Sequence, residues 1–265
     1  MIKNNLKISI ITVAYNSSST IEDTIKSVLS QTYDNYEHII VDGGSKDNTI
    51  KIIEKYKDKY GGKLKYISEK DNGIYDAMNK GIKMSEGDII GLLNSDDIYD
   101  NNKVLEKIAN TIKSEECDGT YGDLTYYDEN LKKPKRKWIT GKGKIRHGWI
   151  MAHPTMYLKK EIYEEVGVYN TNYKIVADYD FIIRLSENKN FNLIYIQEDL
   201  IRMRLGGTSS DGLKGYWKNI KEANRVLKAN GYWYSELIIF IRIIKTLIQM
   251  IRAKFNNKKT ICIYL

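Results

Sequence analysis

Residues 7–14 read Lys-Ile-Ser-Ile-Ile-Thr-Val-Ala, and residues 36–42 read Tyr-Glu-His-Ile-Ile-Val-Asp. Both runs are short and rich in β-branched residues, which predicts two buried strands. Between them, Ile21, Ile25 and Val28 recur at the spacing of one helix face. A strand, a helix and a second strand in this order are typical of a βαβ unit with parallel strands.

The same alternation continues to about residue 97. Strands are predicted over 63–68 and 88–93, and helical spacing predicts helices over 50–57 and 77–84. This pattern predicts an α/β fold with a mostly parallel, Rossmann-like central sheet flanked by helices.

Beyond residue 97 the elements become more varied. We expect helices at 104–112, 160–166 and 178–187 and strands at 119–127, 135–140, 155–158, 191–196 and 200–205. Neither a repeat nor a low-complexity linker interrupts this stretch, so residues 1–210 are predicted to form one domain and residues 211–265 a helical extension.

The composition is that of a globular protein. The chain has 265 residues, of which 42% are hydrophobic and 29% charged, and its two cysteines lack the spacing of a zinc site or a disulfide framework. The apolar run at 8–14 is too short for a signal peptide. We therefore expect a cytoplasmic location for the catalytic part.

Positive charge is concentrated at the C-terminal end. Residues 214–265 contain 11 Lys and Arg against two Asp and Glu, whereas the rest of the chain contains 31 against 32. A nucleic-acid-binding protein usually carries its basic residues on the folded face, so this distribution argues against a nucleic-acid partner. An anionic membrane surface fits a basic and apolar tail better.

The tail is predicted to form two helices, one over 213–229 and one that begins at Ser235. In the second helix, polar residues form a single stripe, which consists of Arg242, Lys245, Gln249 and Arg252. The helix is too charged to span a bilayer, so we expect an amphipathic helix in the membrane interface. Trp233 and Tyr234 would anchor it, and the lipid headgroups would meet Lys254, Lys258 and Lys259. The alternative is that the same apolar face packs on the catalytic domain or on a second subunit, which would make a homodimer.

Polar residues follow the first two predicted strands. Thr12 to Asn16 end the first strand, and Asp42 to Asp47 follow the second. Ligands of open parallel sheets bind outside the carboxyl ends of the strands, so both loops should line one crevice. Asp42 would accept a hydrogen bond from a nucleotide base, whereas Asp47 fits equally well as a helix N-cap.

A pair of carboxylates, Asp96 and Asp97, follows the apolar strand at 88–93 within the run Asn94-Ser95-Asp96-Asp97. Adjacent carboxylates repel each other, and a divalent cation with oxygen ligands would relieve that repulsion. The alternative is that one of the two caps the following helix.

A second pair, Asp178 and Asp180, opens the predicted helix at 178–187. A carboxylate at the mouth of a pocket can act as a general base towards an acceptor hydroxyl. Either residue would serve equally well as a helix cap that complements the helix dipole.

Five segments in order resemble family 2 glycosyltransferases. They are SIITVAYN at 9–16, SVLSQTY at 27–33, VDGGSKD at 41–47, GIYDAMNKG at 73–81 and NSDD at 94–97. The resemblance covers about residues 7–205 and implies a GT-A fold, with a nucleotide-binding half at about 1–97 and an acceptor-binding half at about 98–210. Within the family, the chain most resembles bacterial enzymes that extend surface polysaccharide or O-antigen repeat units.

The resemblance also implies roles for individual residues. Asp178 would be the catalytic base, and Asp96 would hold Mn²⁺ or Mg²⁺, with Asp97 as the competing metal ligand. The residues that would contact the donor nucleotide are Thr12, Ala14, Tyr15, Asn16, Asp42, Gly73, Asn79, Asn94, Ser95 and Asp97, the last of which is also the competing metal ligand. Asn94 departs from the family's D-x-D element, because the first position is an amide here, and Ala177 departs from the usual acidic residue before the base.

The implied reaction is an inverting transfer from a nucleotide-diphosphate sugar, with UDP the most frequent carrier in the family, to a lipid-linked saccharide at the inner face of the cell membrane. Two other functions remain open. A catalytically inactive, membrane-associated scaffold would explain Asn94 and Ala177. A sugar-phosphate nucleotidyltransferase would need a basic, Gly-rich loop after the first strand, and residues 15–19 do not supply one.

Overall fold

A nine-stranded sheet runs through the computed structural model, which describes residues 5–205 and 212–261. Its strands are β1 (Ile8–Ala14), β2 (Tyr36–Asp42), β3 (Leu64–Ser68), β4 (Ile89–Leu92), β5 (Ile98–Tyr99), β6 (Gly119–Tyr127), β7 (Pro134–Trp138), β8 (Tyr157–Lys159) and β9 (Leu193–Arg204). They follow the order β3-β2-β1-β4-β8-β6-β9-β5, and β7 pairs with β6 outside this path.

The first four strands, β1 to β4, form the parallel part of the sheet, as the sequence predicts. Strand β1 lies between β2 and β4 and is buried along its whole length. Ile8 and Ile10 contribute to one hydrophobic cluster, whereas Ile11 and Val13 contribute to another. The alternation shows that helices cover both faces of β1, which explains why this strand is mostly apolar.

The second half of the sheet is largely antiparallel. Strand β8 pairs antiparallel with β4 and with β6, whereas β6 and β9 run parallel. The sequence predicts two strands over 191–196 and 200–205, but the structure has the single strand β9. Its register against β6 jumps between Ile196 and Asp199. The polar pair Gln197 and Glu198 therefore forms a bulge within one strand.

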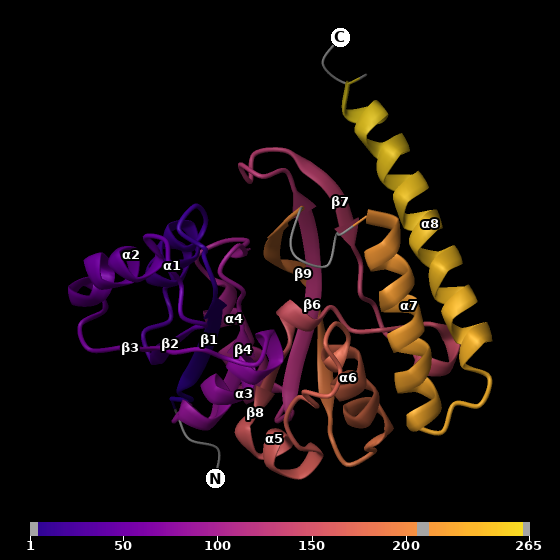
Figure 1. Ribbon diagram of the computed structural model, residues 1–265, viewed down its shortest axis with the longest axis horizontal. Coiled ribbons are helices and arrows are strands. Elements are labelled where there is room, and N and C mark those ends of the chain that lie inside the picture. The colour runs from indigo at the N-terminus through magenta and orange to yellow at the C-terminus, as the bar shows by residue number, and fades with distance from the viewer. Residues whose placement is uncertain (1–4, 206–211, 262–265) are drawn as a thin grey trace.

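Eight α-helices occur in the described residues: α1 (Ile21–Leu29), α2 (Thr49–Tyr56), α3 (Ile74–Met84), α4 (Val104–Ser114), α5 (Lys160–Val166), α6 (Ala177–Glu187), α7 (Gly212–Ala229) and α8 (Ser235–Ile261). Helices α1, α2 and α4 supply one hydrophobic cluster, and α3, α5, α6 and α7 supply the other. Figure 1 shows α7 and α8 beside β6 and β7, on the side away from α1 and α2.

The C-terminal extension packs on the rest of the protein. Val226 and Leu227 of α7 and Ile238 of α8 are fully buried in the same cluster as α3 and α6. Arg242 lies over the ring of Tyr179 of α6, with 4.7 Å from the guanidinium carbon to the ring centroid. The alternative of packing on the catalytic domain therefore holds for one face of this extension.

Three residues of the polar stripe expected along α8, namely Arg242, Lys245 and Gln249, line one cavity beside the domain, so this stripe faces the domain. Arg242 contacts Tyr179, and the Lys245 ammonium donates to the His147 carbonyl at 2.7 Å, so these two side chains turn towards the domain. The domain thus supplies an aromatic face to Arg242 and a carbonyl acceptor to the exposed Lys245. The side chains of Arg252, Lys254, Lys258 and Lys259 lie outside the described residues.

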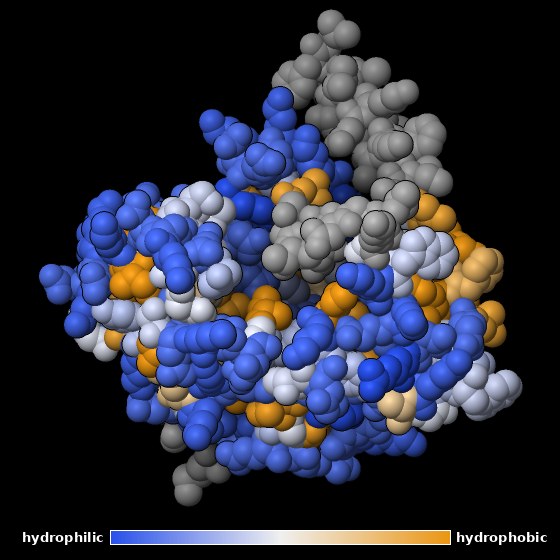
Figure 2. All heavy atoms as spheres, viewed as in Figure 1, coloured by the Kyte–Doolittle hydropathy of each residue, from blue (hydrophilic) through white to orange (hydrophobic). Residues whose placement is uncertain are grey.

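The opposite face of α8 is apolar and exposed. Leu237, Phe240, Ile244, Leu247 and Ile248 are each at least 40% exposed, and Trp233 before the helix is 83% exposed. Figure 2 shows apolar residues gathered at the right edge of the view, along α8. Among the helices described, none combines the length and the apolar character that a membrane crossing requires.

Candidate active site

The loops that follow β1, β2 and β4 are joined by hydrogen bonds at the carboxyl edge of the parallel strands. The Asn16 backbone N–H donates to the Ser45 hydroxyl at 2.7 Å, and the Lys46 N–H donates to the Asn16 side-chain oxygen at 2.9 Å. The hydroxyls of Ser17 and Ser95 lie 2.8 Å apart. Three interlocked loops thus lie together at the edge where the sequence predicts a ligand crevice, and the crevice itself stays a prediction.

Asp42 orders the loop after β2. Its carboxylate is fully buried and accepts hydrogen bonds from the backbone N–H groups of Gly44 (3.0 Å) and Ser45 (2.9 Å) and from the Ser68 hydroxyl (2.7 Å). The Ser45 hydroxyl donates to the other carboxylate oxygen. These contacts hold the loop in shape, and the expected contact of Asp42 with a nucleotide base stays a prediction.

Asp71, which the sequence reading did not single out, lies at the same edge, just after β3 and beside Gly43. A β-carbon on Gly43 would lie 2.6 Å from its carboxylate, so a larger residue at position 43 would require the Asp71 side chain to shift. Asp71 also accepts the N–H of Gly73 at 2.9 Å, and Gly73 adopts a φ of 116° immediately before α3. Tyr15 is 63% exposed at the same edge, where it would be accessible to a ligand.

Two of the expected nucleotide-side residues of β1 lie inside the sheet. Thr12 is fully buried, and its hydroxyl lies 2.9 Å from Nε2 of His38. Ala14 is buried, and its carbonyl accepts the N–H of Gly43 at 2.8 Å. Both residues hold the end of β1 against β2, and any direct contact with a nucleotide stays a prediction.

The two adjacent carboxylates after β4 have different surroundings. Asp97 is fully buried, and it accepts hydrogen bonds from the Asn94 amide at 3.2 Å and from the Arg204 backbone N–H at 3.3 Å. Burial raises the pKa of Asp97 well above its usual range, and the charge of Asp96 adds to the shift. Neither residue caps a helix, because the next helix, α4, begins only at Val104.

Burial also raises the pKa of Asp96, although the nearby Arg204 opposes the shift. The Arg204 guanidinium donates to the Asp96 carbonyl at 2.9 Å and bonds Asp23 at 2.5 Å, so it is engaged with other partners. No cluster of three or more acidic, His or Cys side chains suited to a metal occurs in the described parts of the chain. A cation here would therefore rely on Asp96, water and the ligand's own oxygens, which is an arrangement that suits Mg²⁺ or Mn²⁺.

Asp178 is the second residue of α6 and is half-buried. The hydroxyl of Tyr75 lies 3.0 Å from its carboxylate and 2.6 Å from the Ile175 carbonyl. Burial raises the pKa of Tyr75, and the Asp178 charge adds to this effect, so the phenol stays protonated as a donor. Tyr75 belongs to α3, which starts beside Asp71, and this connects Asp178 to the carboxyl edge of the sheet.

Asp180 has a structural role instead. It is buried and forms an ion pair with Arg184 at 2.9 Å, and it accepts a hydrogen bond from the Asn230 amide at 3.2 Å. The sequence did not distinguish the roles of Asp178 and Asp180. The structure does, because Asp178 contacts Tyr75, whereas Asp180 binds Arg184 within α6 and Asn230 directly after α7.

The loop before Asp178 is held by Glu222 of α7. Its carboxylate accepts three consecutive backbone N–H groups, from Lys174 (3.0 Å), Ile175 (2.8 Å) and Val176 (3.1 Å). Nothing in the local sequence indicates this contact, since Glu222 lies more than 40 residues away in the C-terminal extension. The extension therefore helps to place Asp178.

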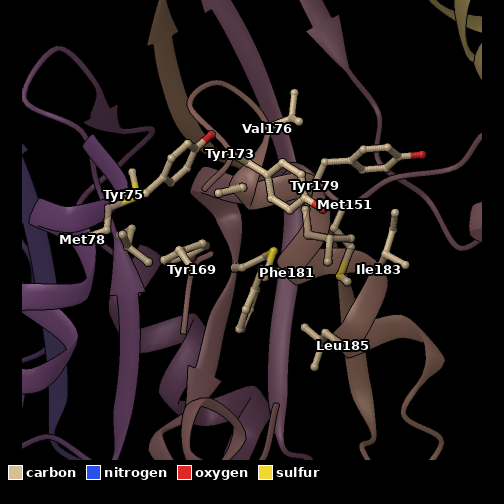
Figure 3. Packing of buried hydrophobic residues seen from close by; sticks show 14 of the residues in the cluster. Tyr75, Met78, Met151, Tyr169, Tyr173, Val176, Tyr179, Phe181, Ile183 and Leu185 are labelled. Carbon is tan, nitrogen blue, oxygen red and sulfur yellow. The ribbon is translucent and has the colours of Figure 1, made fainter. Parts of the chain in front are cut away.

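Asn79 and His153 support the same region from α3 and the segment before β8. The Asn79 side chain donates to the Tyr169 carbonyl at 2.8 Å and accepts its N–H at 3.0 Å. The Tyr169 hydroxyl lies 2.7 Å from Nε2 of His153. Figure 3 shows Tyr75, Tyr169 and Phe181 gathered between α3 and α6. Asn79 thus shapes the wall below Asp178, and its contact with a nucleotide stays a prediction.

The family model for glycosyl transferase family 2 matches residues 9–177, which is well over half of the chain. The chain belongs to this family. As a family 2 glycosyltransferase it is an enzyme of class EC 2.4, and both the resemblance and the enzyme class predicted from the sequence are confirmed.

Curated relatives of this glycosyltransferase include a PGL/p-HBAD biosynthesis glycosyltransferase, Rv2957, of Mycobacterium tuberculosis. It is 28% identical over 182 residues, which are 68% of this chain and 70% of the relative. The uncharacterized glycosyltransferase RC0461 of Rickettsia conorii is 31% identical over 193 residues, which are 67% of this chain but 31% of that longer protein.

Solved structures share the fold of this glycosyltransferase at low sequence identity. Residues 1–349 of S. aureus TarS in complex with UDP-GlcNAc give a TM-score of 0.68 at 19% identity, covering 90% of this chain and 72% of that one. The mannosyltransferase PcManGT from Pyrobaculum calidifontis, in complex with GDP-Man and Mn²⁺, gives 0.63 at 15% identity, covering 85% and 63%. The predicted GT-A fold is thereby confirmed.

Proposed function

We propose that this enzyme transfers a sugar with inversion from a nucleotide-diphosphate sugar, with UDP-sugars first among the candidates, to a hydroxyl of a lipid-linked saccharide. The observation that carries the proposal is the position of Asp178. Tyr75 connects this carboxylate to the start of α3, where Asp71 and Gly43 border the crevice of interlocked loops. A base on one side of a nucleotide crevice is what a single inverting displacement needs.

The donor side of the proposal rests on the carboxyl-edge loops. Tyr15, Asn16 and Gly73 would line the nucleotide, with Asn94 and Ser95 near the ribose and diphosphate. The complexes of TarS with UDP-GlcNAc and of PcManGT with GDP-Man support a donor of this class. A surface polysaccharide role follows from the resemblance to the enzymes that extend bacterial repeat units.

Asp96 would hold the divalent cation, with Asp97 behind it. A bound Mn²⁺ or Mg²⁺ would stabilise the negative charge of the leaving diphosphate. The raised pKa of Asp96 fits this role, because a half-buried carboxylate with no ion pair among the described residues gains from a cation. The Mn²⁺ in the PcManGT complex supports the choice of metal.

Asp178 would take the proton of the acceptor hydroxyl as that oxygen attacks the anomeric carbon of the donor sugar. Tyr75 would orient the carboxylate, and Glu222 would fix the loop before it. Because one displacement suffices, the configuration at the anomeric carbon is inverted. No covalent intermediate on the protein is required.

We further propose that the enzyme acts at the inner face of the cell membrane, with residues 1–210 as the catalytic domain and 211–265 as the extension that reaches the lipid. The apolar, exposed face of α8 supports this location, together with the 11 basic residues of positions 214–265. Within the catalytic domain, the donor would bind to the half at about 1–97 and the acceptor to the half at about 98–210.

A nucleotide panel tests the function. Thermal unfolding is measured with UDP, GDP, dTDP and CMP in the presence of Mn²⁺, Mg²⁺ or EDTA, on the wild type and on Asp96→Ala. A ligand at about 100 times its dissociation constant should stabilise the protein by roughly 2.7 kcal/mol. Stabilisation by one nucleoside diphosphate, dependent on metal and lost in Asp96→Ala, is the expected result. A folded protein that responds to no nucleotide would support the inactive scaffold instead.

A further inference from the structure

A cavity of about 470 Å³ lies between the acceptor half and the C-terminal helices. Strand β7 and residues 139–150 form one wall, and α7 and α8 form the other. The volume is within the range of small-molecule sites. The loops that follow β1, β2 and β4 contribute no residue to its lining, so the cavity is distinct from the predicted donor site.

Four basic side chains line this cavity, namely Arg136, Lys142, Arg242 and Lys245, and the described lining contains no acidic residue. Within the part of the chain that the structure describes, none of the four forms an ion pair. Arg136 lies 4.3 Å from the centroid of Tyr126, and the contacts of Arg242 and Lys245 are to an aromatic ring and a carbonyl. Four cations around a small cavity repel one another, and a bound anion would relieve that repulsion.

Aromatic and aliphatic residues complete the wall. Trp138 and Trp149 face the cavity, with Ile220, Ile239 and Ile243 from the two helices. The Trp149 ring is held in place because its N–H donates to the Thr140 carbonyl at 2.9 Å. Fixed indole rings suit the apolar face of a sugar, whereas the isoleucines suit a hydrocarbon chain. The lining therefore fits an amphiphilic anion better than a free inorganic one.

Two walls of the cavity contact the elements that carry the proposed base and the proposed metal site. Arg242 of its wall covers the ring of Tyr179, the residue after Asp178. Tyr126 pairs with Met203 of β9, and the next residue, Arg204, donates to Asp97. Burial raises the pKa of Tyr126, the positive charges of Arg136 and Arg242 oppose the shift, and the charge of Asp97 adds to it. The cavity wall is thus linked, through Tyr179 and through β9, to the elements that carry the proposed base and the proposed metal site.

We propose that this cavity binds the phosphate-bearing end of the lipid-linked acceptor, with the four basic residues on the phosphates and the tryptophans against the first sugar. The proposal rests on the function given above and names the part of the acceptor that is recognised. The same helix, α8, lines the cavity with one face and exposes apolar residues on the other. A helix that lies in the membrane interface would hold the cavity at the depth of lipid phosphates.

Binding of farnesyl diphosphate, measured by calorimetry in EDTA, tests the proposal. EDTA prevents the probe from binding through a metal at Asp96. Farnesol and inorganic pyrophosphate are the comparison probes. The wild type should bind farnesyl diphosphate, and the double variant Arg136→Gln/Arg242→Gln should bind at least tenfold more weakly. Lys221→Gln, which removes an exposed charge from α7 outside the cavity, is the matched control and should bind as the wild type does.

Each other outcome overturns the proposal. Equal affinity for pyrophosphate and farnesyl diphosphate would mean a site for free anions, and equal affinity for farnesol would mean a purely apolar site. Unchanged binding by a folded double variant would place the probe elsewhere. If the double variant does not fold, the single variant Lys142→Gln replaces it. Weaker binding of farnesyl diphosphate by Lys142→Gln would then support the proposal, and unchanged binding would overturn it. Failure of the proposed function is detected separately, because the nucleotide panel on the wild type measures donor binding in the absence of any acceptor.

Discussion

The Tyr75 hydroxyl lies 3.0 Å from the Asp178 carboxylate and 2.6 Å from the Ile175 carbonyl. The hydroxyl has a single proton, which can be donated well to only one of these acceptors at a time. Tyr75 is therefore shared between the Asp178 side chain and the loop before it. This contact joins α3 to α6. It connects the start of α3, beside the interlocked loops, to the proposed base.

We expect Tyr75→Phe to lower kcat about tenfold and to leave the donor KM unchanged, because the ring still packs while the carboxylate loses its donor. A lost hydrogen bond of this kind also costs about 1 kcal/mol of stability. Steady-state kinetics and thermal unfolding measure the two effects. A variant with wild-type kcat would show that Tyr75 does not orient Asp178.

Asp178→Asn should reduce transfer by about 10²- to 10⁴-fold, since removal of a general base has an effect of this size. Asparagine keeps the shape and can still accept the Tyr75 hydrogen bond, so nucleotide binding should match the wild type. Transfer from a radiolabelled donor and the nucleotide panel give the two readouts. Asp180→Asn is the matched control. It should lose stability through its Arg184 ion pair while it keeps transfer activity. An active Asp178→Asn enzyme would remove Asp178 from the role of base.

Glu222→Ala should lower both stability and kcat, because three backbone N–H groups before Asp178 lose their acceptor. We expect a loss of roughly 1–3 kcal/mol, the range for unsatisfied donors. Glu222→Gln retains one acceptor oxygen and should recover part of both properties. Chemical unfolding and kcat are compared with Glu164→Ala, an exposed control on α5. Equal kcat in Glu222→Ala and in the control would assign Glu222 to stability alone.

Stability should fall between pH 6.5 and pH 5 because of His38. Burial lowers the pKa of His38 to about 3, and its ring nitrogens contact the hydroxyls of Thr12 at 2.9 Å and Tyr60 at 2.6 Å. The unfolded chain binds a proton below about pH 6.5, whereas the folded chain does not, so stability is lost as the pH falls through this window. At pH 5 the loss is on the order of 2 kcal/mol.

The pH effect of His38 is measured as the free energy of unfolding in urea at pH 7.5 and pH 5. His38→Gln cannot titrate and should show a correspondingly smaller difference between the two values. Burial lowers the pKa of His153 as well, so part of the slope should persist in His38→Gln. Glu37 does not interfere, because its pKa is lowered to about 2 and its contribution is lost only at more acid pH. Identical pH slopes in the wild type and His38→Gln would contradict a buried, neutral His38.

The sequence predicted the parallel half of the sheet well because its signals are local. Strand β2 begins and ends where the pattern of 36–42 predicts, and the polar residues after β1, β2 and β4 meet at one edge. Contacts between distant segments had no such signal. Glu222 reaches the loop before Asp178 from α7, and Asp71 reaches Gly43 across β3. Asp178 and Asp180 became distinguishable only when the partners of each carboxylate were known.

The surroundings of the C-terminal extension were predicted only in part, for a different reason. An amphipathic pattern reports which residues avoid water, but it does not say what covers them. The sequence left membrane and domain as alternatives for one apolar face, whereas α8 has two. Ile238 and Ile239 pack on the domain, and the face with Phe240 and Leu247 is exposed.

The exposed face of α8 yields the last prediction. Each large apolar side chain transferred from water to lipid contributes roughly 1.5–3 kcal/mol, so the double variant Phe240→Asp/Leu247→Asp should bind vesicles at least 100-fold more weakly than the wild type. Binding is measured by sedimentation with vesicles of phosphatidylglycerol and phosphatidylcholine, and Val168→Asp, at another exposed apolar residue, is the control. Because both aspartates point away from the domain, the variant should keep its fold and its response to nucleotides. The competing explanation is that this face binds a second copy of the chain, and the mass of the wild type in ultracentrifugation tests it. A stable dimer that the double variant splits, together with no vesicle binding by the wild type, would assign this face to a second subunit.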